Sequence, residues 1–87
     1  MNLKQLTIAF LSPRWPAAYT EAAVAQRLNA SQMLDKRCTA DDVADALRAL
    51  HRMKMVDLHI DPMDGSAVWQ ATEEGIKKWV LEGRATI

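Results

Sequence analysis

The sequence is poor in the residues that build cross-links and metal sites. Its 87 residues include one cysteine, Cys38, and two histidines, His51 and His59. A single thiol cannot form an internal disulfide, and the two histidines are too isolated to share the ligand spacing of a zinc site. A reducing, cytoplasmic setting therefore fits best, and the sequence predicts no metal and no other cofactor.

Long hydrophobic runs and glycine-rich loops are also lacking. No stretch approaches the roughly 18 apolar residues that a membrane helix needs, so no membrane partner is expected. Near the start, Lys4 and Gln5 interrupt the apolar residues and no small-residue cleavage site follows, which argues against a secretory signal. The glycines are isolated from one another, and this spacing excludes a phosphate-cradling loop: Gly65, Gly75 and Gly83.

The chain has no excess of charge of either sign, since 11 lysines and arginines balance 11 aspartates and glutamates. Modules dedicated to nucleic acids are usually basic overall, so this balance argues against a strongly DNA-binding surface, although a local basic patch would suffice. Apolar residues, in contrast, make up 49% of the chain, which supports a folded core. The length allows one domain, expected over residues 1–83 with a short tail at 84–87.

The first predicted helix covers about residues 2–11, where apolar residues recur at helical spacing. Ser12-Pro13 ends it, because the residue before a proline avoids helical geometry. The loop that follows carries Trp15 between two prolines. We expect Trp15 to fold back onto the core rather than to serve as a recognition motif. The first predicted helix should bury Leu3, Leu6, Phe10 and Leu11.

Two further helices are predicted from N-capping threonines. Thr20 precedes a helix that ends near residue 29 or runs on to 34, and a loop at 35–38 follows. Thr39 precedes a helix that runs to about residue 54, with two aspartates in the first turn, where they favour the helix dipole. Their expected buried stripes are Val24, Ala25 and Leu28, then Val43, Ala46, Leu47 and Leu50.

The periodicity then changes from helix to strand. Residues 56–60 alternate apolar and polar side chains, which predicts a half-buried strand, and residues 67–71 form a second strand. The turn formers at 61–66 predict that the two strands pair as a hairpin, which must pack on the helices to be stable.

A closing helix is expected from an N-cap at Thr72 to about residue 82, with a stop at Gly83. Its expected buried stripe is Ile76, Trp79 and Val80. Three helices, a hairpin and a closing helix, in that order, form the winged helix-turn-helix plan of an α+β domain.

The hairpin and the start of the closing helix resemble the wing of the MarR family of transcriptional regulators. The matching residues are Asp61, Pro62, Asp64, Ala67, Thr72, Glu74 and Gly75. The resemblance covers about residues 3–80 and implies a winged helix that binds double-stranded DNA and regulates transcription. Ser66 stands where the family has its wing arginine, which reaches toward the minor groove. The family's flanking dimerisation helices have no room in this length, and the link from Asn29 to Cys38 is longer than a usual helix-turn-helix turn.

In this plan the third helix enters the major groove of DNA. Helical geometry places Asp41, Asp45, Arg48 and Arg52 on its exposed face. We expect Arg48 and Arg52 to contact bases and Lys36, Arg37 and Lys54 to contact phosphates, with Ser66 at the wing position that the resemblance implies. About four phosphate contacts predict modest affinity for one copy, and a homodimer would double the number of contacts. Arg27 on the second helix adds to the usable positive charge.

A second hypothesis is a winged helix that binds a protein partner or itself without binding DNA, since a fold does not fix a function. Asp41 and Asp45 on the reading face and the missing wing arginine favour it. A continuous positive face would favour DNA, and an apolar patch at Trp15, Tyr19 or Met63 would favour a protein.

Catalysis is not expected. His51 and His59 have no nucleophile or carboxylate partner at a suggestive spacing. Cys38 precedes a helix and follows Arg37, an arrangement that can lower a thiol pKa, but a buried or incidental thiol is the favoured interpretation.

Overall fold

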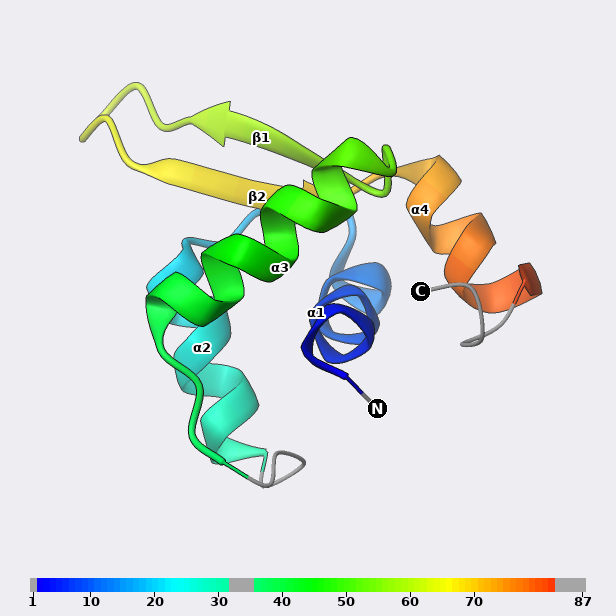
Figure 1. Cartoon of the computed structure of the whole chain (residues 1–87). Helices are drawn as coiled ribbons and strands as arrows, with labels where there is room; N and C mark the ends of the chain where they lie inside the picture. Colours follow the sequence, from blue (N-terminus) through cyan, green and yellow to red (C-terminus); the bar gives the residue numbers. More distant parts are fainter. Residues whose placement is uncertain (1, 32–35, 83–87) are drawn as a thin grey trace.

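The computed structural model describes residues 2–31 and 36–82, and within them the chain forms a winged helix (Figure 1). Helix α1 crosses beneath α3, α2 lies beside both, and the hairpin extends away from the helices above α3. None of the described helices is long and apolar enough to cross a membrane. In chain order the elements are α1 (Leu3–Leu11), η1 (Ser12–Arg14), α2 (Glu21–Ala30), α3 (Ala40–Arg52), β1 (Val56–Ile60), β2 (Ala67–Ala71), α4 (Glu73–Lys77) and η2 (Lys78–Glu82).

Each α-helix begins at a side-chain cap. The side-chain oxygens of Asn2, Thr20, Thr39 and Thr72 each accept a hydrogen bond from the backbone N–H three residues on. Such a cap satisfies one of the unpaired donors of the first turn and contributes about 1 kcal/mol. The three threonine caps and the bounds of both strands are as predicted.

The core forms where the predicted stripes of α1, α2 and α3 meet. Leu6, Phe10 and Leu11 of α1 are buried, as are all the stripe residues predicted for α2 and α3. Leu3 is half-buried against this cluster. Ile8 is fully buried and was not in the predicted stripe, because α1 is covered by α3 on one side and by the hairpin on another.

Helix α3 ends two residues before the predicted position, in a Schellman motif. The Lys54 N–H donates to the His51 carbonyl at 3.0 Å, and the Met55 N–H donates to the Leu50 carbonyl at 3.0 Å. Lys54 has φ of 62°, the left-handed conformation that this motif requires. Met55 and Leu50 are both buried, which supplies the apolar contact typical of the motif.

The hairpin is antiparallel, with Val56 opposite Ala71 and Ile60 opposite Ala67. Tyr19 adds a short third strand, because its N–H and C=O exchange hydrogen bonds of 2.8 Å with Trp69. Trp69 is buried, and its indole N–H donates to Glu21 at 3.3 Å. The sheet is thereby tied to the start of α2.

Three predictions of burial are wrong. Trp15 is 44% exposed and does not fold back onto the core; Tyr19 packs edge-on against Phe10 instead. Val80 is 68% exposed, because the last turns are a π-helix, whose wider winding shifts the stripe. Strand β1 is buried only at Val56, because it is the outer strand of the hairpin; Leu58 is exposed although Trp69, its partner in register, is buried.

The link between α2 and α3 is fixed at its base. Helix α2 ends at Ala30, close to the earlier of the two predicted ends. The Asn29 amide donates to the Cys38 carbonyl at 2.9 Å and accepts from the Cys38 N–H at 2.8 Å. This pair of bonds sets where α3 begins. The other predicted end of α2, at 34, and the stop at Gly83 lie outside the described residues, as does the tail at 84–87.

Candidate nucleic-acid interface

The solvent face of α3 carries the four charged residues that the helical spacing predicts. Asp41, Asp45, Arg48 and Arg52 are all exposed, while Val43, Leu47 and Leu50 on the opposite face are buried. In Figure 1 this helix lies across the front of the molecule. Its outer face is therefore free to approach a partner.

The first half of that face is acidic for a local reason. Asp42 closes a capping box, in which it accepts the Thr39 N–H at 3.0 Å while the Thr39 hydroxyl accepts the Asp42 N–H at 3.1 Å. Asp41 stands in the same turn, where negative charge is favourable near the positive end of the helix dipole. These aspartates stabilise the helix, but they also repel phosphates near its N-terminus.

The second half of the face is basic. The Arg48 guanidinium forms an ion pair with Asp45, one turn earlier, and both side chains are largely exposed. An exposed pair of this kind contributes little and exchanges readily with another anion. Arg52 stands one turn after Arg48, and no ion pair joins it to another described residue. Lys54 follows at the end of the helix, exposed and held by the Schellman motif.

Lys36 and Arg37 lie at the other end of α3, in the loop that the Asn29–Cys38 bonds hold against α2. Helix α3 has 13 residues, so about 20 Å separates its two ends. Between the two basic groups stand the three aspartates of the acidic half. The structure thus places the predicted phosphate-binding residues in two separate clusters instead of one continuous positive face.

The wing is acidic as well. From Met55 to Ile76 the chain has no lysine or arginine. Ser66, at the predicted wing position, is half-buried, and its backbone N–H donates to the Asp64 carboxylate at 2.9 Å. This bond and one from the Ser66 hydroxyl hold the pKa of Asp64 below its usual value, so the wing tip stays negatively charged. Ser66 therefore cannot replace the charge of an arginine.

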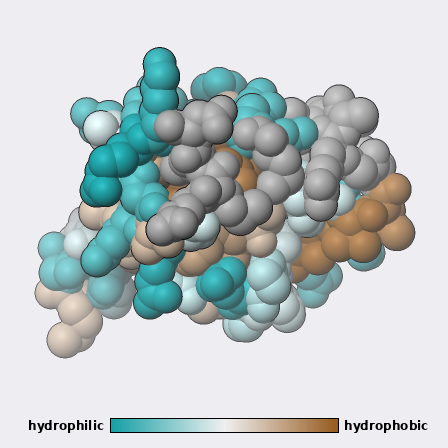
Figure 2. Space-filling view, turned by 90° about the horizontal axis from the view of Figure 1, so that it is seen from below, coloured by the Kyte–Doolittle hydropathy of each residue, from teal (hydrophilic) through white to brown (hydrophobic). Residues whose placement is uncertain are grey.

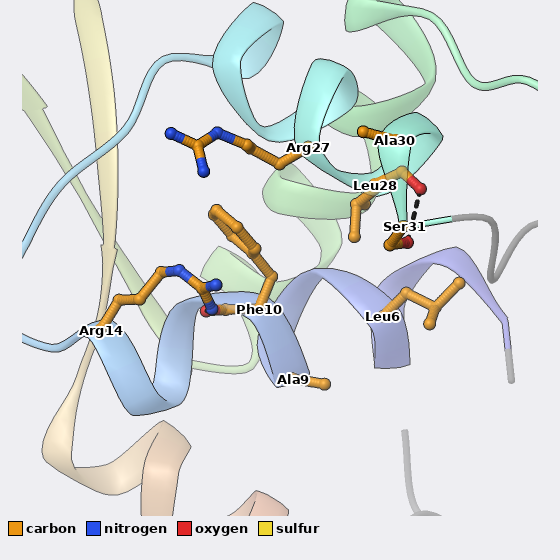
Figure 3. A pocket seen from close by; sticks show the side chains of 8 residues that line it. All are labelled: Leu6, Ala9, Phe10, Arg14, Arg27, Leu28, Ala30 and Ser31. Carbon is orange, nitrogen blue, oxygen red and sulfur yellow. Dashed lines mark hydrogen bonds between the residues drawn. The ribbon is translucent and has the colours of Figure 1, made fainter.

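A hollow of about 420 Å³ lies between α1 and α2 (Figure 3). The Arg14 guanidinium stacks 4.0 Å from the centre of the Phe10 ring and donates to the Phe10 carbonyl at 2.7 Å. Arg27 lines the same hollow from α2. Arg27 is among the residues predicted to add positive charge for DNA, but its side chain lines this hollow and adds nothing to the outer face of α3.

No catalytic arrangement is formed by the candidate residues. Cys38 is half-buried, and desolvation, its largest influence, raises the pKa of the thiol, contrary to the activation that Arg37 and the helix start would have given. His51 packs edge-on against Trp69, with ring centres 5.9 Å apart. Within residues 2–31 and 36–82, no three histidine, cysteine or acidic side chains are grouped as metal ligands would be.

Exposed apolar side chains gather in two places away from α3. The first is the outer half of the hairpin, with Leu58 and Ile60 on β1 and Met63, 91% exposed, at the tip. The second is η2, where Val80 and Leu81 are exposed. Figure 2 shows a brown surface on the right, the side on which α4 and η2 lie. Alternation in β1 revealed the apolar face but not its exposure, which follows from the position of β1 as the outer strand of the hairpin.

The whole arrangement is similar to that of MepR from S. aureus. The MepR structure in complex with DNA superposes with a TM-score of 0.72 and 24% sequence identity, covering 88% of this chain and 56% of the MepR chain. A MepR mutant from a multidrug resistant clinical isolate superposes with a TM-score of 0.70, at 24% identity, covering 88% of this chain and 51% of that chain. This chain spans about half the length of those proteins.

No family model matches the chain, and no curated protein matches its sequence. The structural likeness nevertheless confirms the predicted fold, a winged helix like that of MepR, which is a MarR-family regulator. At 24% identity it is a likeness of fold.

Proposed function

We propose that this chain is a small, non-catalytic winged-helix protein that binds double-stranded DNA by placing α3 in the major groove, as a regulator of transcription in the cytoplasm. The observation that carries the proposal is the pair Arg48 and Arg52, one turn apart on the exposed face of the helix that this fold presents to DNA. The fold shared with a protein crystallised on DNA supports it.

The distribution of charge on α3 favours contact through its second half. Arg48 exchanges its exposed partner Asp45 for a base edge or a phosphate, and Arg52 has no competing ion pair among the described residues. Lys54 reaches the backbone beside the groove, while Lys36 and Arg37 reach phosphates at the other end of the helix. Asp41 and Asp45 limit how closely the first half of α3 approaches the phosphates.

Affinity for one copy is expected to be modest and sensitive to salt. About four phosphate contacts predict a slope near −3.6 for log K against log salt on duplex DNA, from a contribution of about −0.9 for each contact. The wing adds no basic side chain to this total. Binding should therefore be measurable at low salt and fall steeply as salt rises.

The first test is a titration of the chain against mixed-sequence duplex DNA at low and moderate salt. Binding that weakens steeply with salt supports the proposal. If the chain does not bind at about 100 μM protein and low salt, its affinity is weaker than ordinary non-specific affinity for DNA, and the proposal is rejected.

A site-selection experiment then separates the roles of the basic residues. Arg48→Ala should cost about 1–3 kcal/mol on the preferred sequence and relax one base position, whereas Lys54→Ala should weaken binding to all sequences and reduce the salt slope by about 0.9. Lys77→Ala, on the exposed side of α4, is the matched control and should leave both quantities unchanged. An Arg48→Ala protein that keeps the parent's preference would contradict a base-reading role.

The second candidate function is a winged helix that binds a protein instead of DNA. The observation that favours it is the hairpin, where Leu58, Ile60 and Met63 are exposed on a segment without basic residues. Such a surface suits an apolar partner better than a phosphate backbone. The absence of DNA binding at both salt concentrations in the same titration would favour this candidate.

A further inference from the structure

The outer edge of β1 has no partner strand among the described residues. Strand β2 pairs with β1 on one side and with Tyr19 on the other, so the order of the three strands is Tyr19, β2, β1. Figure 1 shows β1 as the outermost strand, away from α1 and α2. An open edge presents backbone donors and acceptors that can pair with another strand.

The hydrogen bonds already described determine which backbone groups point outward. Trp69 uses both its N–H and its C=O on Tyr19, so it exchanges no hydrogen bonds with Leu58, its partner in register. Met55 and Asp61 flank the two ends of β1 and bond toward the β2 side. The Met55 carbonyl accepts from the Thr72 N–H, and the Asp61 N–H donates to the Ser66 carbonyl. By the two-residue period of a strand, the N–H and C=O groups of Val56, Leu58 and Ile60 therefore face the open edge.

The edge has few of the features that usually prevent pairing, and of the aspartates, glutamates, lysines and arginines only Asp57 lies on β1. Natural edge strands carry lysine, proline or a bulge, or are covered by another element. Strand β1 reads Val-Asp-Leu-His-Ile, with no lysine, arginine or proline, and its register with β2 is regular. Leu58 is 41% exposed and Ile60 is 62% exposed.

The same five residues are complementary to themselves when paired antiparallel about Leu58. In that register Leu58 lies opposite Leu58 of the second copy, Asp57 opposite His59, and Val56 opposite Ile60. The outward-facing N–H and C=O groups of Val56, Leu58 and Ile60 then form three hydrogen-bonded pairs with the second copy. Each pair exchanges two bonds, which gives six N–H···O bonds. The Asp57 and His59 pairs fall on the alternate positions, where side chains approach most closely, and there the imidazole donates to the carboxylate.

We propose that two copies of this chain associate through antiparallel pairing of their β1 edges, about a two-fold axis at Leu58. The pairing joins the two hairpins into one continuous sheet and covers the exposed Leu58 and Ile60 side chains of each copy. The interface is isologous, so every contact occurs twice. The proposal rests on the hairpin alone and does not depend on whether α3 binds DNA.

The first test is the mass of the full chain in solution without DNA, by sedimentation equilibrium from about 10 μM to about 1 mM, a range suited to the weak to moderate affinity of a small interface. A monomer–dimer equilibrium is expected.

Leu58→Lys, which opposes two cations at the axis, should lower the association constant at least about tenfold. Leu81→Lys makes the same change at another exposed leucine and should leave it unchanged. A chain that stays monomeric throughout, a dimer insensitive to Leu58→Lys, or one abolished by Leu81→Lys would overturn the proposal.

A charge-complementation test excludes misfolding as the cause. One variant carries Asp57→Lys with His59→Lys, and the other carries His59→Asp, so each alone opposes like charges at both pairs. Each should be monomeric with the circular dichroism of the parent. An equimolar mixture opposes lysine to aspartate at every pair and should recover the dimer, whereas folded variants that stay monomeric on mixing would refute the register.

Discussion

On the inner strand β2, Trp69 and Ala71 are buried against the helices. On the outer strand β1 only Val56 is buried, whereas Ile60 and Leu58, which lies directly opposite Trp69, are exposed. The two strands differ in their neighbours, because β2 contacts α1, α2 and Tyr19, whereas β1 forms the outer edge of the sheet. Strand β2 is therefore where substitutions should change stability, and the exposed positions of β1 are where they should change association.

The largest expected effect is at the centre of β2. Trp69→Ala removes a buried ring, its hydrogen bond to Glu21 and its edge contact with His51. We expect the free energy of unfolding to fall by about 3–5 kcal/mol, as for other large-to-small substitutions of aromatic residues. Urea unfolding followed by circular dichroism measures this. A loss below about 1 kcal/mol, the level of surface substitutions, would show that β2 is no more constrained than the exposed positions of β1.

Gly75→Ala should have the next largest effect. A Cβ at Gly75 would lie 2.1 Å from the Met55 carbonyl oxygen, which is backbone and cannot rotate away. The start of α4 must then move from the end of α3, and we expect a loss of about 1–3 kcal/mol. The melting temperature of this variant is compared with that of Glu74→Ala, which changes an exposed residue in the same turn. Equal melting temperatures would contradict the close packing.

Lys54→Gly should stabilise the chain, by about 1 kcal/mol, because Lys54 has a positive φ that glycine adopts without steric cost. The same substitution removes a proposed phosphate contact, so DNA affinity should decrease while stability rises. Urea unfolding and the salt titration on one preparation measure the two effects. A stability change without a decrease in the salt slope would remove Lys54 from the proposed interface and leave its structural role intact.

The smallest effect is expected at Ile60. Ile60→Thr keeps a β-branched side chain at an exposed position of β1, so the unfolding free energy of the dilute monomer should change by less than about 0.5 kcal/mol. Dimer formation should weaken, because Ile60 lies opposite Val56 of the second copy. A large loss of monomer stability would mean that the outer half is packed within its own chain.

The positions of the elements were predictable because short-range chemistry sets them. Thr20, Thr39 and Thr72 mark helix starts by a bond to a backbone group three residues away, and this information is local. The resemblance of Thr72-Glu73-Glu74-Gly75 to the MarR wing also has a physical basis here, since Gly75 lies against the Met55 backbone. The fold followed from these signals and from the helical stripes.

Exposure was not predictable where it depends on distant elements. Leu58 and Val80 belong to apolar patterns and Trp15 is a loop aromatic, yet all three are exposed, because their surroundings are set by elements distant in the sequence. On α3, the spacing gave the exposed residues, but not the ion pair that Arg48 forms with Asp45 or the separation of Lys36 and Arg37 from Lys54. The roles of these residues in binding DNA stay predictions.

The two hydrogen bonds between Asn29 and Cys38 hold the end of α2 beside the start of α3. Once the base of a loop is fixed, each doubling of its length costs only about 0.6 kcal/mol in closure entropy. The link is consequently a natural insertion point. We expect that a peptide tag placed there would leave the first turn of α3 where it is, because the bonds from Asn29 to Cys38 lie at the base of the loop.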